Sequence, residues 1–317
     1  MTEPTDTPQS DTPKESGDLS VTALYTAQTW RWGRLPNAEL FESKESRAVF
    51  GVTNIALAVM KLFSWKLKSL RHSLIHRHVM IDALIDEVQP DVVIELAAGL
   101  SRRGVTVSSD ERIEYWEIDL PHVVAKKKML LERTPTGQAM LERSNHHWVA
   151  EDVRNVPLQT MSRAHNKRVY VAEGLCMYLQ PNEQRTFWSR IAEDVRSAMG
   201  PALFVFDLVP WCEQPKPGWF GRALEWLMKR FTKGQSFARD ERTRETICAD
   251  LKASGFQNVQ ALEPHDVLQR WRLPYPKKKT QQVIFVCGNE AAEPTISALK
   301  VESNPPSIHG QPPHPQP

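Results

Sequence analysis

A run of β-branched residues that breaks into a glycine turn is the most informative chemical feature of this sequence. Residues 91–104 read D-V-V-I-E-L-A-A-G-L-S-R-R-G, so an apolar run gives way to small residues and Gly99. This order is typical of a buried parallel strand that enters a tight turn. Because small residues let the backbone approach a ligand closely, we expect the turn to bind a cofactor rather than to be an ordinary strand-to-helix connection.

An acidic residue ends the next strand-like run. The run R-I-E-Y-W-E-I-D closes on Asp119, about twenty residues after Gly99, where a carboxylate can accept hydrogen bonds from ribose hydroxyls. The G-x-G-x-x-G fingerprint and the lysine of a phosphate-binding loop are both missing from the turn. Together these features predict a nucleotide-like cofactor without a diphosphate.

Three further positions are candidates, each with a competing structural explanation. Asp152, in A-E-D-V-R-N, can accept a hydrogen bond from an exocyclic amine such as that of adenine, or can cap a helix. Glu173 follows a buried apolar run, where an uncompensated acid would be costly, so we expect it at the lip of a cleft. Arg77 suits bidentate pairing with a carboxylate, or is a surface arginine.

The histidines and cysteines give no pattern for a metal site. His72, His76 and His78 have no acid partner at metal-ligand spacing, so we interpret them as structural. The basic residues from Lys61 to Arg77 predict a solvated helix face, with an anionic ligand or a membrane surface as the alternative. The four cysteines are far apart and form no C-x-x-C pair, which favours a reducing cytoplasm.

Composition divides the 317 residues into a folded body and two tails. Residues 1–20 and 291–317 are predicted to be disordered, because they have little apolar surface to offset their ordering entropy. The body is predicted to hold a helical cap at 21–90 and a cofactor-binding domain at 91–290, with an aromatic-rich insertion or lid at 211–240. The net charge of +2 gives no specific reason to expect nucleic acid as a partner. Neither a membrane span nor a signal peptide is expected.

Strand-like and helical patterns alternate through the body. Helical apolar spacing at 121–133, 181–199 and 240–254 separates most of the expected strands, which lie at 92–97, 112–119, 147–153, 168–175, 202–209, 256–262 and 283–288. The alternation predicts an α/β fold with a Rossmann-like, seven-stranded, mostly parallel sheet. The last strand is expected to be antiparallel, because the proline-containing segment before it gives no long crossover helix. Ligands of such sheets bind at the carboxyl ends of the strands.

These motifs together resemble those of class I S-adenosylmethionine-dependent methyltransferases. More narrowly, they resemble the leucine carboxyl methyltransferase family and its bacterial O-methyltransferase relatives, over about residues 21–288. The resemblance rests on T-A-L-Y-T-A at 22–27, the helix of Arg77, E-L-A-A-G-L-S-R-R-G at 95–104, Y-W-E-I-D-L-P at 115–121, A-E-D-V-R-N at 150–155 and A-E-G-L-C-M-Y-L at 172–179. It implies S-adenosylmethionine as the cofactor.

The resemblance also implies roles for residues that bind the cofactor. Arg77 would bind its carboxylate, and Gly99 would lie under its methionine part. Asp119 would hold the ribose and Asp152 the adenine amine. Glu173 would bind the amino group of the methionine part.

Three more residues of the same motifs complete the expected site. Glu95 and Val153 are expected cofactor contacts, and Tyr178 is the catalytic candidate because the resemblance places it near the transferred methyl group. No metal is expected in the site.

Methyl transfer from a sulfonium is an in-line displacement, for which a protein supplies alignment and desolvation. A carboxylate acceptor is already ionised near neutral pH and needs no general base. A hydroxyl acceptor would need one, from Asp207 or a histidine of the cap. We expect an O-methyltransferase for a small-molecule or peptide acceptor, with a carboxylate favoured. One alternative is a non-catalytic S-adenosylmethionine-binding module. The other is a nicotinamide-dependent oxidoreductase, and the missing G-x-G-x-x-G fingerprint argues against that one.

Overall fold

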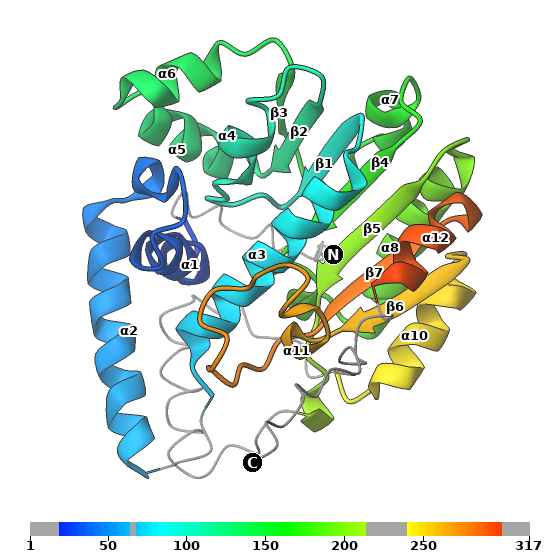
Figure 1. Ribbon diagram of the computed structural model, residues 1–317. Coiled ribbons are helices and arrows are strands. Elements are labelled where there is room, and N and C mark those ends of the chain that lie inside the picture. Colours follow the sequence, from blue (N-terminus) through cyan, green and yellow to red (C-terminus); the bar gives the residue numbers. More distant parts are fainter. Residues whose placement is uncertain (1–18, 64–67, 214–239, 300–317) are drawn as a thin grey trace, which may run out of the picture.

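A seven-stranded sheet forms the centre of the protein (Figure 1). The structure, a computed structural model, describes residues 19–63, 68–213 and 240–299. The strand order is β3-β2-β1-β4-β5-β7-β6, and β7 is antiparallel to both of its neighbours while the other pairs are parallel. The strands are Val92–Leu96 (β1), Glu114–Asp119 (β2), His146–Ala150 (β3), Arg168–Ala172 (β4), Ala202–Asp207 (β5), Asn258–Leu262 (β6) and Ile284–Gly288 (β7).

The central strands are hydrophobic on both faces. Every residue of β1, β4 and β5 is buried, in the sequences V-V-I-E-L, R-V-Y-V-A and A-L-F-V-F-D. Near-continuous apolar strands of this kind are typical of parallel sheets that are covered by helices on both sides. The predicted seven-stranded, mostly parallel sheet with an antiparallel last strand is therefore confirmed.

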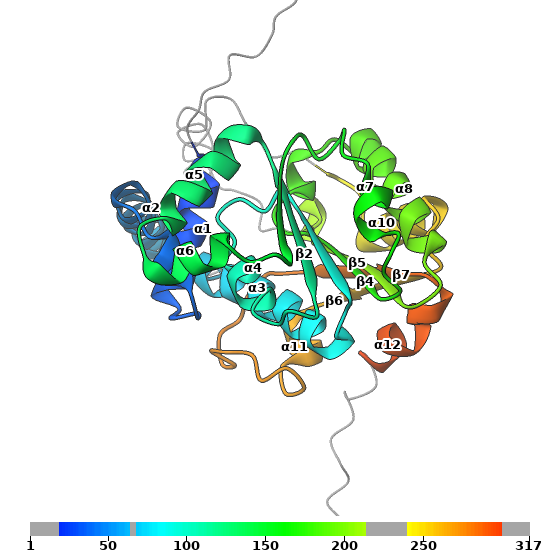
Figure 2. The ribbon, with the colours of Figure 1, turned by 90° about the horizontal axis from the view of Figure 1, so that it is seen from above.

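Helices cover both faces of the sheet (Figure 2). On one face, Met80, Ile81 and Leu84 of α3 pack with the side chains of alternate strand residues, and on the other Trp188 of α8 and Leu251 of α10 do so. The helices of the sheet domain are Leu70–Val88 (α3), Arg103–Val107 (α4), Pro121–Leu131 (α5), Pro135–Leu141 (α6), Leu158–Ser162 (α7), Pro181–Ser197 (α8), Arg244–Ala253 (α10), Pro264–Val267 (α11) and Glu293–Ala298 (α12). Short 3-10 helices span Cys176–Tyr178 (η2), Trp211–Glu213 (η3) and Glu290–Ala292 (η4).

The expected helical cap begins with two helices that lie beside the sheet (Figure 1). They are Val21–Trp32 (α1) and Lys44–Phe63 (α2), joined through the 3-10 helix Ala38–Phe41 (η1). Trp30 of α1 and Phe41 share an apolar cluster with Leu130 of α5, which fixes the cap against the β2–β3 half of the molecule. No helix in the described part of the chain is long and apolar enough to cross a membrane.

Parts of the sequence-based domain division lie beyond the described residues. Residues 1–18 and 300–317 of the predicted tails and residues 214–239 of the predicted lid lie outside the described part of the chain. Residues 291–299 of the predicted C-terminal tail are described, and they hold the end of η4 and all of α12, with Ile296 and Leu299 buried. The stretch that predicted a solvated helix face contains α3 instead, where Arg77 is buried. That prediction was wrong for Arg77, because acids from two other strands neutralise the guanidinium inside the protein.

Candidate functional site

The predicted site residues converge on one edge of the sheet. Gly99, Asp152 and Glu173 follow β1, β3 and β4, Asp119 is the last residue of β2, and these strands run in parallel. Asp207 ends β5 at the same edge. The carboxyl ends of parallel strands are where open α/β folds bind their ligands.

The turn after β1 is held by the acid at the end of β2. The N–H of Gly99 donates to Asp119 Oδ2 at 2.6 Å, and the N–H of Leu120 donates to Oδ1 at 2.7 Å. Gly99 has a φ of 53°, in the left-handed region that favours glycine. A Cβ added to Gly99 would have a single neighbour, the Cβ of Ala23, at 3.9 Å. The space above this turn is therefore open.

Asp119 keeps acceptor capacity after it has fixed the turn. An ionised carboxylate offers about four lone-pair positions, of which backbone N–H groups use two here. Burial raises the pKa of Asp119, and the hydrogen bonds from Gly99 and Leu120 act in the opposite direction. The remaining positions can accept two hydroxyl groups of a ligand.

The second half of the edge is an ionic cluster centred on Arg77 from α3. Its Nε donates to Glu173 Oε1 at 2.9 Å and its Nη1 donates to Asp207 Oδ2 at 3.0 Å. The side chains of Arg77 and Glu173 are each 6% exposed and that of Asp207 is fully buried. The Nη2 of Arg77 has no hydrogen-bond partner among the described residues, so the guanidinium can still donate to a ligand.

Gly174 lets the backbone pass next to this guanidinium. It has a φ of 73°, and its N–H donates to Asp207 Oδ1 at 2.5 Å. A Cβ added to Gly174 would lie 3.5 Å from both Nη1 and Nη2 of Arg77, an ordinary van der Waals contact, so the left-handed φ is what favours glycine at this position.

A second arginine, which the sequence reasoning missed, lies behind Glu173. Arg103 is fully buried, its Nη2 donates to Glu173 Oε2 at 2.7 Å and its Nε donates to Asp82 Oδ1 at 2.7 Å. Its Nη1 pairs with Glu95, which also accepts from Tyr115 Oη at 2.6 Å. Sequence did hold a signal for it, because an acid such as Glu95 inside a buried apolar strand requires a cation nearby.

The charges around Glu173 fix its ionisation. Burial alone would raise the pKa of this carboxyl, but His78, Arg77 and Arg103 together hold it well below its usual range. Burial raises the pKa of Asp207, and the positive charge of Arg77 acts in the opposite direction. The neighbouring histidine, His78, has a pKa lowered by burial and contacts Glu173 Oε2 through Nδ1 at 2.8 Å.

Three other predicted residues lie on this edge with different surroundings. Asp152 is ion-paired with Arg154, whose side chain is mostly exposed, and Val153 is half-buried. Tyr178 follows β4, and its Oη donates to Thr22 Oγ1 of α1 at 2.9 Å. That hydrogen bond connects the edge of the sheet to the cap.

Comparison with known families identifies the family of this chain. A family model described as leucine carboxyl methyltransferase matches residues 31–192. The chain belongs to the leucine carboxyl methyltransferase family. The description of this family names a methyltransferase. The match spans α1 to α8 and so includes the glycine turn and both arginines of the cluster.

Solved structures with a similar fold include several methyltransferases. A putative O-methyltransferase from Nostoc punctiforme is 12% identical, over 68% of this chain and 56% of that one, with a TM-score of 0.45. An O-methyltransferase family protein from Burkholderia thailandensis is 12% identical, over 85% and 72%, with a TM-score of 0.46. Human N-acetylserotonin methyltransferase in complex with S-adenosylmethionine is 15% identical, over 84% and 64%, with a TM-score of 0.43. This chain thus spans little more than half the length of the Nostoc protein. No curated protein matches the sequence.

The residues of this leucine carboxyl methyltransferase family member fit the family's cofactor. The open space over Gly99 can take an extended ligand, and the spare acceptor positions of Asp119 suit a vicinal diol. The free Nη2 of Arg77 suits a carboxylate. Among the described residues, no group of three or more potential ligands could hold a metal ion.

Proposed function

We propose that this protein methylates a carboxylate of a small-molecule or peptide acceptor, with S-adenosylmethionine as donor. The choice of acceptor rests on one observation: hydrogen bonds and ion pairs already occupy the acids and the histidine at the carboxyl edge that could act as a general base. Glu173 and Asp207 are both held by Arg77, and Asp119 is held by backbone N–H groups. A carboxylate acceptor is already ionised near neutral pH, so none of these groups has to remove a proton from it.

His76, which directly precedes Arg77, is similarly occupied by hydrogen bonds. His76 Nε2 is 2.6 Å from the carbonyl oxygen of Pro274, so Nε2 carries the proton and donates. Nδ1 is then the acceptor for Thr280 Oγ1 at 3.0 Å. Burial also lowers the pKa of His76. A role as general base would require this residue to break both hydrogen bonds.

Each residue of the site then has a task in binding or alignment. Arg77 would bind the carboxylate of the cofactor and Asp119 its ribose, while Glu173 would bind its amino group. Glu95 would act through Arg103 to hold Glu173 in place. When bound, the sulfonium supplies an activated methyl group, so the protein needs to exclude water and align the acceptor.

Three residues have roles in this proposal that depend on the cap and on β3. Tyr178 would lie near the transferred methyl group, and its hydrogen bond to Thr22 keeps the ring at the junction with α1. Asp152 would bind the adenine amine after exchanging its ion pair with Arg154, and Val153 would contact the ring. We place the reaction in the cytoplasm, because the four cysteines are free in the fold and two of them are buried.

The test is methyl transfer from methyl-labelled S-adenosylmethionine to a panel of carboxylic acids and phenols. Methyl esters release volatile labelled methanol in mild alkali, whereas methyl ethers do not. We expect alkali-labile label with acids. Alkali-stable label with phenols alone would overturn the carboxylate assignment and favour a hydroxyl acceptor.

A further inference from the structure

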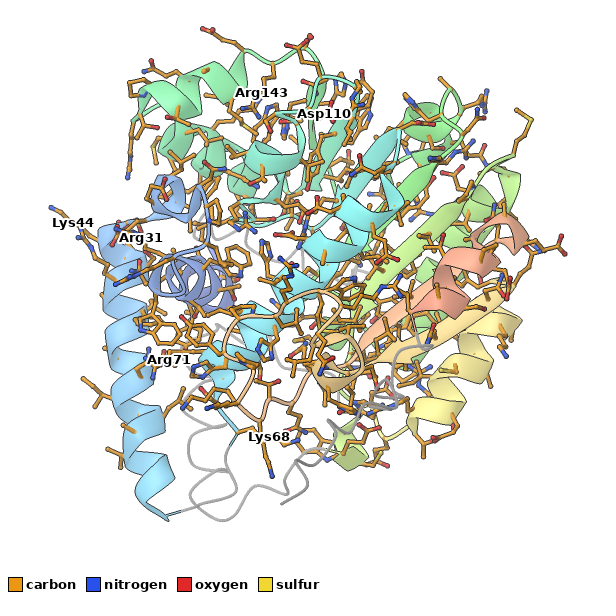
Figure 3. The ribbon with its side chains drawn as sticks, viewed as in Figure 1. Arg31, Lys44, Lys68, Arg71, Asp110 and Arg143 are labelled. Carbon is orange, nitrogen blue, oxygen red and sulfur yellow. The ribbon has the colours of Figure 1, made fainter. Side chains whose placement is uncertain are left out.

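A basic pocket is lined by residues of the start of α3, of α11 and of the segment that leads into β7. It has a volume of about 370 Å³, and its lining includes Lys68 at the start of α3 and the consecutive lysines Lys277, Lys278 and Lys279. All four lysines are exposed. Figure 3 shows Lys68 below the segment that leads into β7, at the border of the molecule. We call this cavity the lysine pocket.

The segment that carries the lysines is tied to α3 and to the ionic cluster. Thr280 bonds His76, the neighbour of Arg77, and the N–H of Gln281 donates to Ser73 Oγ at 3.1 Å. Gln282 Nε2 donates to Asp207 Oδ2 at 3.1 Å. Asp207 also accepts from Arg77. The short segment 280–282 therefore connects the lysine pocket to the ionic cluster of the candidate cofactor site.

The positive charge of the lysine pocket has no counterpart within the described residues. None of the four lysines forms an ion pair with any described acid. One acid, Glu263, lines the pocket, but it is already paired with Arg244 Nη2 at 2.8 Å. Four uncompensated like charges around a concave surface repel one another and concentrate a positive potential there.

Backbone constraints keep these charges together. Pro264 and Pro276 belong to the wall, and His76 anchors the carbonyl of Pro274 on the other side of the lysines. The N–H of Lys278 donates to the carbonyl of Tyr275 at 2.9 Å, which closes a turn at the start of the lysine run. These contacts fix the backbone from which the lysine side chains extend, so their charges share one region of the surface, where an anionic group can relieve their repulsion.

We propose that the lysine pocket binds a second anionic group, a carboxylate or a phosphate, of the methyl acceptor. The acceptor is then an acid with two anionic groups, of which one is methylated and the other is held by Lys68 and Lys277–Lys279. This inference rests on the proposed function, because it assumes that the group at the cofactor is a carboxylate. It gives the acceptor an orientation that one carboxylate alone would not have.

The first arm of the test measures anion binding directly. Inorganic phosphate is titrated calorimetrically into the protein saturated with S-adenosylhomocysteine, at constant ionic strength. The variant K277S/K278S/K279S is expected to bind phosphate at least about tenfold more weakly than wild type. The matched control K44S/K167S/K252S removes the same charge from exposed sites elsewhere, and Figure 3 shows Lys44 far from Lys68. Equal weakening in both variants, or no phosphate binding by wild type, would overturn the proposal.

The second arm links the pocket to the acceptor. Methyl transfer is compared between linear dicarboxylic acids of increasing length and monocarboxylic acids of matched length. We expect one range of diacids to exceed the monoacids by about tenfold in kcat/KM, and K277S/K278S/K279S to abolish that advantage through KM. Monoacids methylated as well as diacids would contradict the second anionic group. Failure of the proposed function looks different, because then no acid is methylated while the phosphate titration still reports on the pocket.

Discussion

The two halves of the carboxyl edge hold their acids in different ways. At the β1–β2 half, backbone N–H groups fix Asp119, and the turn above it is open. At the β4–β5 half, arginines from α3 and α4 hold Glu173 and Asp207 in a cluster with little solvent contact. Backbone donors leave a carboxylate with spare acceptor capacity, whereas arginines neutralise it and fix its place.

From this difference we propose separate tasks for the two halves. The first half suits the uncharged, hydroxyl-bearing part of S-adenosylmethionine, since Asp119 can accept more hydrogen bonds. The second half suits the zwitterionic amino-acid part, since both signs of charge are already paired there and Arg77 has a donor left. Variants that weaken one half should therefore discriminate between ligands that carry or lack the amino-acid part.

The largest effect is expected from removing the arginine behind the cluster. Arg103→Met leaves Glu95, Asp82 and Glu173 without their shared cation. The free energy of unfolding should fall by about 3–5 kcal/mol, because buried acids lose their counterion. Urea denaturation measures this change. Arg112→Met, at an ion pair whose arginine is 82% exposed, serves as the control and should leave the midpoint unchanged. Equal midpoints for the two variants would show that the cluster does not support the fold.

The second prediction separates the two halves by ligand. Arg77→Lys keeps the charge but loses the planar fork that reaches Glu173 and Asp207 together with a ligand. Affinity for S-adenosylhomocysteine should fall by about 10- to 100-fold, as expected for lost hydrogen bonds to a charged group. Affinity for 5′-methylthioadenosine, which lacks the amino-acid part, should change little.

Arg71→Lys is the matched control for that experiment. Arg71 lies on the same helix, with its Cζ 4.4 Å from the ring centre of Trp32. Its substitution by lysine should leave both affinities unchanged. If Arg77→Lys weakened both ligands equally, its effect would be on the structure of the site and not on recognition of a carboxylate.

The third prediction concerns the β1–β2 half. Asp119→Ala should weaken S-adenosylhomocysteine and 5′-methylthioadenosine equally, by about 1–3 kcal/mol, because both carry the ribose. Asp110→Ala, at a half-exposed site in the loop before β2 that lies in the upper part of Figure 3, should change neither affinity. Calorimetric titration of both ligands gives the comparison. Unchanged affinity in a folded Asp119→Ala protein would remove the ribose assignment.

The smallest effect is a difference in the pH dependence of stability. The pKa of Glu173 is lowered in the folded state, so its stabilisation is present above the ordinary glutamate pKa and is lost as pH falls below it. The pKa of Asp119 is raised, so this residue opposes stability as pH rises through its folded value. Between pH 5.5 and pH 3.5, Glu173→Gln should lose less stability on acidification than wild type, and Asp119→Asn should lose more. If both variants changed the slope of unfolding free energy against pH in the same direction, the proposed difference between Glu173 and Asp119 would be refuted.

Sequence predicted the backbone of the site more fully than its ionic contacts. The strands and the turn at Gly99 follow from β-branched runs and small residues, which are local signals. These features depend on few residues, so one sequence contains enough to find them.

The partners of the buried charges could not be predicted in the same way. Arg103 and Asp82 lie on different helices, and their contact exists only after α3 and α4 pack against β1. In sequence, Arg102 and Arg103 look like two surface arginines before a helix. The acid Glu95 within a buried strand was the one hint that a cation had to be near.

The most direct measurement is a calorimetric titration of the protein with S-adenosylhomocysteine, with a reduced nicotinamide cofactor as the control. We expect micromolar binding of S-adenosylhomocysteine and no binding of the nicotinamide, because the edge offers Asp119 for ribose and Arg77 for a carboxylate but no glycine-rich diphosphate site. Binding of the nicotinamide in preference to S-adenosylhomocysteine, or binding of neither, would contradict this expectation.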